Sequence, residues 1–213
     1  MDGPERDSFL TAARIVGDLC RRPEVTRAWT DESACTGMSV GGLAFHLAGQ
    51  VTSTVRLVAS PRSDGETIPL LEHYVRAAWV HSDLDAEANA GIRAGSDAEA
   101  EAGPDALAAL LDEQLARLPG VLDAAADDAT VYIPWQGWSL SLHDWLVTRE
   151  MEIVVHSDDL AASVDLETPE FPEPVVTDVL ALLTGVAVRR HGQTAVVRAL
   201  SRPQRAPSSV SAF

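Results

Sequence analysis

Cationic side chains are scarce in this sequence, and lysine is missing altogether. The 213 residues include 16 basic residues, all of them arginine, against 32 acidic ones, which leaves a net charge of -16. Binding to nucleic acid needs clustered cations to neutralise the phosphates, and a surface of this charge repels them. The composition therefore argues against a nucleic-acid partner.

Cysteines and long apolar runs are equally scarce. Cys20 and Cys35 have neither a CxxC spacing nor the density of a disulfide framework, so we interpret both as structural or incidental residues in a reducing cytoplasm. No segment approaches the roughly 20 apolar residues of a membrane span. The start of the chain, MDGPERDSFL, is too charged for a signal peptide. We expect a soluble, cytoplasmic protein without a membrane partner.

Strand-type alternation is rare, whereas apolar residues recur at helical spacing through most of the chain, which predicts an all-α fold. Caps, such as Ser39 before residue 40, and prolines delimit the expected helices. These helices cover residues 8–21, 40–59, 68–81, 104–125, 141–163, 174–192 and 193–200. Pro119 is expected to bend or divide the fourth of them, and residues 131–133 could be extended. The alanine- and acid-rich segment 83–103 can be helical but holds few large apolar residues and cannot bury much, so we expect a surface excursion or a mobile segment there.

The helix expected from Ser141 onward organises the chain. Ser141 and Asp144 form an S-x-x-D capping pattern at its start. Leu146, Ile153 and Leu160 then repeat every seven residues, as in one seam of a buried helix. This pattern predicts a core helix, with its buried face set by the three apolar residues.

Four ionisable residues share or border that buried face: Arg149, Glu152, His156 and Asp159. Residues three or four apart are neighbours on a helix surface, so Glu152 and His156 present a carboxylate and an imidazole side by side. His46 borders the apolar stripe of the helix expected at 40–59 and could supply a third ligand. Three protein ligands with an open position are typical of catalytic zinc, but any helical Glu–His pair produces the E-x-x-x-H spacing, and a lone core histidine is usually only hydrogen-bonded.

Other candidate residues allow two readings each. Trp135 and Trp138, around a Pro and a Gly, could line a ligand site or plug the end of the bundle. His73 and His81 are expected to be ordinary histidines on a solvent-edge helix. Five arginines between residues 189 and 205 either complement a solvated helix end or form an anion clamp over a pocket.

Two motifs in order, GMSVGGLAFHLAGQ at 37–50 and R-x-x-E-x-x-x-H-x-x-D-L at 149–160, resemble the mycothiol-dependent maleylpyruvate isomerase N-terminal domain family of the DinB-like metalloprotein superfamily. The segment 185–206, GVAVRRHGQTAVVRALSRPQRA, is similar to C-terminal segments of that family. The resemblance covers most of residues 8–205. The C-terminal region is shorter than in the complete isomerases, which leaves the actual substrate open.

The resemblance implies an up-down-down-up four-helix bundle with an additional C-terminal helical segment. We place the metal-binding bundle at residues 1–165 and a linker with a helical appendage at 166–213. The resemblance further implies a divalent metal, zinc by preference, held by His46, Glu152 and His156 at one end of the bundle. Mycothiol is the implied cofactor or cosubstrate, and the arginine-only composition suits an actinobacterial mycothiol producer.

A metal-bound thiolate could add to an electrophilic small molecule, either for S-transfer or for thiol-assisted isomerisation. In that enzyme Asp159 would orient a ligand imidazole, Arg149 would neutralise an anionic substrate or pair with Glu150 or Glu152, and Trp135 and Trp138 would bind the cofactor. Attachment or exchange of a thiol on a natural-product intermediate is an alternative for the same site. A non-catalytic stress or regulatory protein, with a structural metal or none, is the alternative of a different class.

Overall fold

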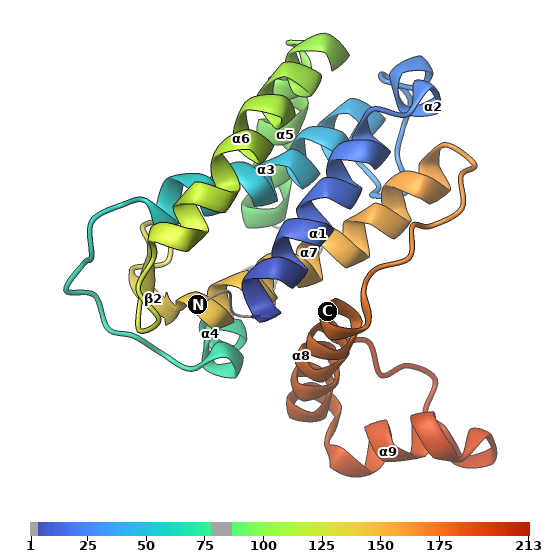
Figure 1. Ribbon diagram of the computed structural model, residues 1–213. Helices are drawn as coiled ribbons and strands as arrows, with labels where there is room; N and C mark the ends of the chain where they lie inside the picture. Colours follow the sequence, from blue (N-terminus) through green and yellow to red (C-terminus); the bar gives the residue numbers. More distant parts are fainter. Residues whose placement is uncertain (1–3, 78–86) are drawn as a thin grey trace.

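The computed structural model describes residues 4–77 and 87–213 and is mainly helical. Four long helices form the bundle: α1 (Pro4–Cys20), α3 (Val40–Val58), α6 (Pro104–Ala124) and α7 (Leu142–Ser163). In Figure 1, α1 and α7 run in one direction, whereas α3 and α6 run in the opposite one. The predicted all-α class and up-down-down-up bundle are therefore confirmed, and α6 continues through Pro119 without being divided.

Two serine caps fix where α3 and α7 begin. The hydroxyl of Ser39 accepts a hydrogen bond from the Gly42 N–H at 3.0 Å, and that of Ser141 accepts one from the Asp144 N–H at 3.0 Å. Each cap satisfies a backbone donor that has no partner inside the helix. Both helix starts therefore lie where the sequence predicted them.

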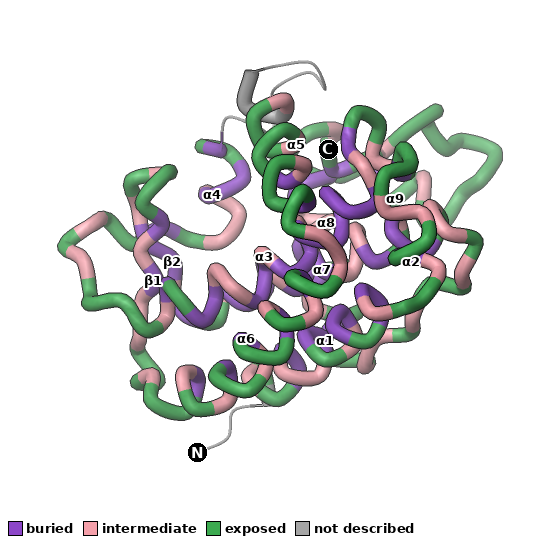
Figure 2. Tube along the Cα trace, turned by 90° about the horizontal axis from the view of Figure 1, so that it is seen from above, coloured by how far each residue is buried: buried purple, intermediate pink, exposed green. Residues whose placement is uncertain are grey.

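The core lies between the four bundle helices. The predicted seam of α7 is buried, with Leu146 at 2% exposure and Ile153 and Leu160 at 0%. The α7 helix packs against α3, in which Leu43 and Leu47 are fully buried. Figure 2 shows buried stretches along α3, in contrast to α6, much of which is exposed.

Helices flank the bundle on several sides. They are α2 (Pro23–Arg27), α4 (Leu70–Arg76) and α5 (Glu87–Ala100). The α5 helix packs against α3, and the Asp97 carboxylate accepts hydrogen bonds from both the backbone N–H and the hydroxyl of Ser39, at 3.0 and 2.6 Å. This part of the alanine- and acid-rich segment is thus a helix docked on α3. Of residues 90–100, only Ser96 and Ala100 are buried, so the segment buries little, as its composition predicted.

A small hairpin precedes α7. Strands β1 (Thr130–Ile133) and β2 (Trp138–Ser141) pair antiparallel, with Val131 opposite Leu140. The extended conformation expected at residues 131–133 is confirmed. Both paired residues are buried, so the hairpin extends the core at the end where α7 begins.

The C-terminal region forms α8 (Glu173–His191), α9 (Gln193–Ser201) and a 3-10 turn (Pro203–Arg205). The α8 helix packs against α7 and α1, and the chain end returns to α4, where the Phe213 ring lies 5.7 Å from that of Tyr74. The division of the chain at residue 165 stays a prediction. Among the described helices, none combines the length and apolar content that crossing a membrane demands.

His73 on α4 contradicts the expectation of a solvent-edge histidine, because only 4% of it is exposed. Its Nδ1 accepts a hydrogen bond from the Trp138 indole N–H at 3.1 Å. Burial, followed by the nearby Arg149 cation, lowers the pKa of His73 to about 4. The imidazole is therefore neutral near pH 7. The companion residue His81 lies outside the described residues.

We expect His73 to make the protein sensitive to mild acid. Its pKa is about 4 when folded and 6.5 by its ordinary value, so between these pH values the unfolded chain binds a proton that the folded chain does not. Stability should fall as the pH drops through this window, by roughly 1.4 kcal/mol per pH unit at most. In His73→Gln, which keeps a neutral acceptor for Trp138, that part of the loss should disappear from urea unfolding measured at several pH values. His143→Gln, at an exposed histidine, is the control, and equal pH slopes in wild type and His73→Gln would contradict this account.

Candidate metal centre

Three predicted ligands converge where α3 packs against α7. His46 comes from α3, and Glu152 and His156 come from successive turns of α7. The Glu152 Oε2 atom lies 3.5 Å from His46 Nε2 and 3.3 Å from His156 Nε2. The two imidazole rings are perpendicular, with centroids 4.8 Å apart. We call these three residues the His46 site.

The His46 site fits a divalent metal. Zinc binds imidazole nitrogen and carboxylate oxygen at about 2.0–2.2 Å, so two such ligands of a tetrahedral ion are about 3.3 Å apart. The two N···O distances match that separation within a few tenths of an ångström. The three ligand atoms all lie within 4.8 Å of one another, and the side chains keep 14–24% exposure. An ion and a further ligand can therefore reach them from solvent.

The Glu152 carboxylate is the negatively charged group of the His46 site. Burial opposes its ionisation, but hydrogen bonds with His156 and His46 outweigh burial and hold the pKa of Glu152 well below its ordinary value. Burial likewise disfavours a charged His156, but hydrogen bonds with Asp159, Cys35 and Glu152 raise the pKa of His156 well above its usual range. The Glu152 carboxylate is thus ionised and has an imidazole partner on each of two sides.

Asp159 holds the far side of the His156 ring. Its Oδ2 lies 2.9 Å from His156 Nδ1, which leaves Nε2 directed to the His46 site. A carboxylate in this place fixes the tautomer and orientation of a metal-binding histidine. Asp159 therefore lies beside the His156 ring, as its spacing on the helix predicted. Its role in orienting a metal-binding imidazole stays a prediction.

Cys35 lies beside the candidate ligands, which the sequence did not indicate. Its thiol donates to Asp159 Oδ2 at 3.2 Å and lies 3.7 Å from His156 Nδ1. By contrast, Cys20 is buried, and burial raises the pKa of its thiol to about 12. The structure therefore separates one core cysteine from one beside the candidate ligands, and no spacing in the sequence distinguishes them.

The Arg149 side chain pairs with neither of the carboxylates suggested for it. Its guanidinium donates to Gln50 Oε1 at 2.7 Å and to Thr148 Oγ1 at 3.0 Å, and it stacks 4.6 Å above the Trp145 ring. Glu150 points elsewhere: it is 2% exposed, and burial, followed by Asp178 and Glu5, raises its pKa to about 8. In the described part of the chain the guanidinium is instead held by Gln50 of α3 and by Thr148 and Trp145 of α7, so the predicted ion pair is wrong. The alternative role, neutralising an anionic substrate, stays a prediction.

Gln50 is a second residue beside the candidate ligands whose contacts the sequence did not indicate. It is 4% exposed, its amide oxygen accepts from Arg149, and its amide nitrogen donates to the His46 backbone carbonyl at 2.8 Å. It thus ties the Arg149 guanidinium of α7 to the turn of α3 that carries His46. A buried glutamine one turn after a candidate ligand is the signal that could have indicated this bridge.

The two tryptophans lie at the hairpin and have different surroundings. Trp135, in the turn between the strands, is 57% exposed, whereas Trp138 is half-buried and bonded to His73. The polar contact of Trp138 therefore serves the packing of α4. The assignment of both residues to cofactor binding stays a prediction.

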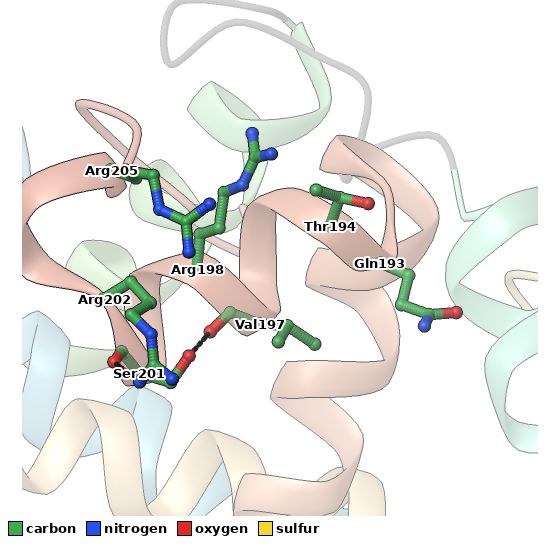
Figure 3. Close-up of a pocket in the computed structure, with 7 residues that line it drawn as sticks. All are labelled: Gln193, Thr194, Val197, Arg198, Ser201, Arg202 and Arg205. Atoms are coloured by element: carbon green, nitrogen blue, oxygen red, sulfur yellow. Dashed lines mark hydrogen bonds between the residues drawn. The ribbon is translucent and has the colours of Figure 1, made fainter.

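The C-terminal arginines divide into two groups. Arg189 and Arg190 donate to the carbonyls of Leu71 and Ala212, which tie α8 to α4 and to the chain end. The others line a pocket of about 310 Å³ formed by α9 and the following turn (Figure 3). The residues lining this pocket are Gln193, Thr194, Val197, Arg198, Ser201, Arg202 and Arg205. None of them belongs to the His46 site, so this pocket is separate from the candidate metal centre.

Comparison with known proteins accords with this geometry. A family model described as the mycothiol maleylpyruvate isomerase N-terminal domain matches residues 9–161. The matched segment contains His46, Glu152, His156 and Asp159, together with most of the four bundle helices. No curated protein and no solved structure matches the chain. Because the match covers more than half of the 213 residues, the chain belongs to the mycothiol maleylpyruvate isomerase N-terminal domain family.

Proposed function

We propose that this protein is a metal-dependent enzyme that uses mycothiol, either to transfer sulfur to an electrophilic small molecule or to assist an isomerisation. The observation that carries the proposal is the convergence of His46, Glu152 and His156 on one partly exposed point. Three protein ligands leave a position open for a further ligand, as in catalytic rather than structural zinc sites. We infer the identity of the thiol from the family, whose description names mycothiol.

The metal would supply positive charge that lowers the pKa of an incoming thiol and holds it as a thiolate near neutral pH. Two neutral imidazoles and one carboxylate leave a divalent ion with a net charge of +1, so the ligand set does not cancel that effect. Zinc suits these ligands by geometry and ligand type. The site residues thus support nucleophilic chemistry of sulfur.

The remaining side chains have positioning roles in this proposal. Asp159 accepts a hydrogen bond from His156 Nδ1–H, which keeps the proton on Nδ1 and leaves the lone pair of Nε2 free for coordination. Gln50 fixes the Arg149 guanidinium, and the N–H groups of Arg149 not used by Gln50 and Thr148 are available to an anionic group of the substrate. Charge recognition and metal binding are thereby held on the same two helices.

Replacing the ligands should weaken or remove zinc binding. We expect His156→Ala to purify with little bound zinc and His46→Ala to bind zinc much more weakly than wild type. Asp159→Asn should bind zinc about 10–100-fold more weakly, because it perturbs only the orientation of His156. His143→Ala is the matched control, since His143 is exposed and pairs with Glu5. Elemental analysis and competition with a chromophoric chelator measure both quantities. Stoichiometric metal in both histidine variants would exclude the His46 site.

Metal-loaded wild-type protein should bind mycothiol, and binding should be lost in the metal-free protein and in His46→Ala. Calorimetry measures the binding, and loss of free thiol with a panel of electrophiles measures turnover. Arg149→Met should reduce turnover of anionic electrophiles more than that of neutral ones, because it removes the charge while keeping an apolar stem over Trp145. A metal-loaded protein that neither binds nor consumes mycothiol would refute the enzyme proposal and favour a non-catalytic metal-binding protein.

A further inference from the structure

A second group of possible metal ligands faces the other nitrogen of His156. Cys35 Sγ, His156 Nδ1 and Asp159 Oδ2 form a triangle with sides of 2.9 Å between nitrogen and oxygen, 3.2 Å between sulfur and oxygen, and 3.7 Å between sulfur and nitrogen. We call these three residues the Cys35 site. The His46 site uses the opposite ring nitrogen, Nε2, so the one imidazole lies between two ligand sets.

The loop that carries Cys35 is anchored on both sides of the thiol. The Ala34 N–H donates to the Ser163 hydroxyl at the end of α7, at 2.8 Å. The buried Ser33 hydroxyl bonds to the Met38 carbonyl at 2.8 Å and accepts from the Cys35 N–H at 3.2 Å. These bonds hold the backbone next to α7, so the position of the thiol over His156 is set by the fold.

The dimensions of the Cys35 site are those of a metal site. With zinc–sulfur bonds of about 2.3 Å and zinc–nitrogen or zinc–oxygen bonds of about 2.0–2.1 Å, tetrahedral ligands are about 3.3–3.6 Å apart. The triangle requires shifts of only a few tenths of an ångström to reach these values. His156 and Asp159 keep 24% and 29% side-chain exposure and Cys35 is half-buried, so an ion can enter from solvent.

We propose that Cys35, His156 Nδ1 and Asp159 form a second metal site, selective for thiophilic divalent ions, that competes with the His46 site for His156. A thiolate ligand favours zinc and cadmium over harder ions such as magnesium. On binding, the S–H bond of Cys35 breaks, a sulfur–metal bond forms and the proton passes to the solvent.

Competition follows from the chemistry of one imidazole. A neutral imidazole carries a proton on one nitrogen and a lone pair on the other. Coordination through Nδ1 therefore places the proton on Nε2, which then donates to Glu152 and no longer serves as a ligand of the His46 site. The competition rests on the proposed metal-dependent function, whereas the Cys35 site itself needs neither His46 nor Glu152.

Cadmium titration of the full-length protein tests this proposal, because thiolate coordination produces an ultraviolet charge-transfer band. We expect His46→Ala to bind one Cd²⁺ per chain and to show the band. Adding Cys35→Ser, which keeps a hydroxyl donor for Asp159, should abolish the band, whereas adding Cys20→Ser should leave it intact. The single variant Cys35→Ser should bind one Cd²⁺ without the band, through the His46 site. Circular dichroism confirms that each variant is folded.

Two results would overturn the proposal. If folded His46→Ala shows no thiolate band, or if the band survives Cys35→Ser, the Cys35 site does not exist. If wild-type protein binds two Cd²⁺ at the full band intensity of His46→Ala, the sites do not compete. Loss of Cd²⁺ binding in Cys35→Ser together with a normal band in His46→Ala would instead refute the His46 site and leave the Cys35 site standing.

Discussion

The antiparallel packing of α3 against α7 is the constraint on which the candidate centre depends. His46 and Glu152 are 106 residues apart in sequence, and only the contact between these helices brings their side chains together. Burying an unpaired carboxylate costs several kcal/mol. Here the Glu152 carboxylate lies between two imidazoles. The packing of α3 against α7 therefore brings the charged group together with the partners that stabilise it in the core.

Local signals in the sequence were sufficient for the bundle. The Ser39 and Ser141 caps, the seven-residue seam of α7 and the family motifs predicted the main helices and the three ligands. Burial set by distant residues was not predictable in this way. The α5 helix is docked through the contact of Asp97 with Ser39, and His73 is buried beneath Trp138. The spacing of apolar residues in these two segments predicts neither contact.

The surroundings of Arg149 show which features helix periodicity predicts and which it does not. Spacing correctly placed Arg149 and Glu152 on neighbouring turns of one face, and the arginine cation does contribute to lowering the pKa of Glu152. The direct partners, however, come from both helices and are not the carboxylates that the spacing suggested. Gln50 of α3 accepts from the guanidinium, and the Trp145 ring provides a surface for stacking. A sequence pattern therefore predicts proximity on a helix better than it predicts contacts.

The two ring nitrogens of His156 face parts of the molecule that differ in rigidity. On the Nε2 side, both partners come from long helices that pack through the core, so the separation of the ligands is fixed by the bundle. On the Nδ1 side, Cys35 comes from the connection before α3, held mainly by hydrogen bonds such as that of Ala34 with Ser163. Hydrogen-bonded connections adjust more readily than close-packed cores. The candidate ligands on the two helices are thus held at a fixed separation, whereas small adjustments of the anchored loop are enough to change the distance between the Cys35 thiol and His156.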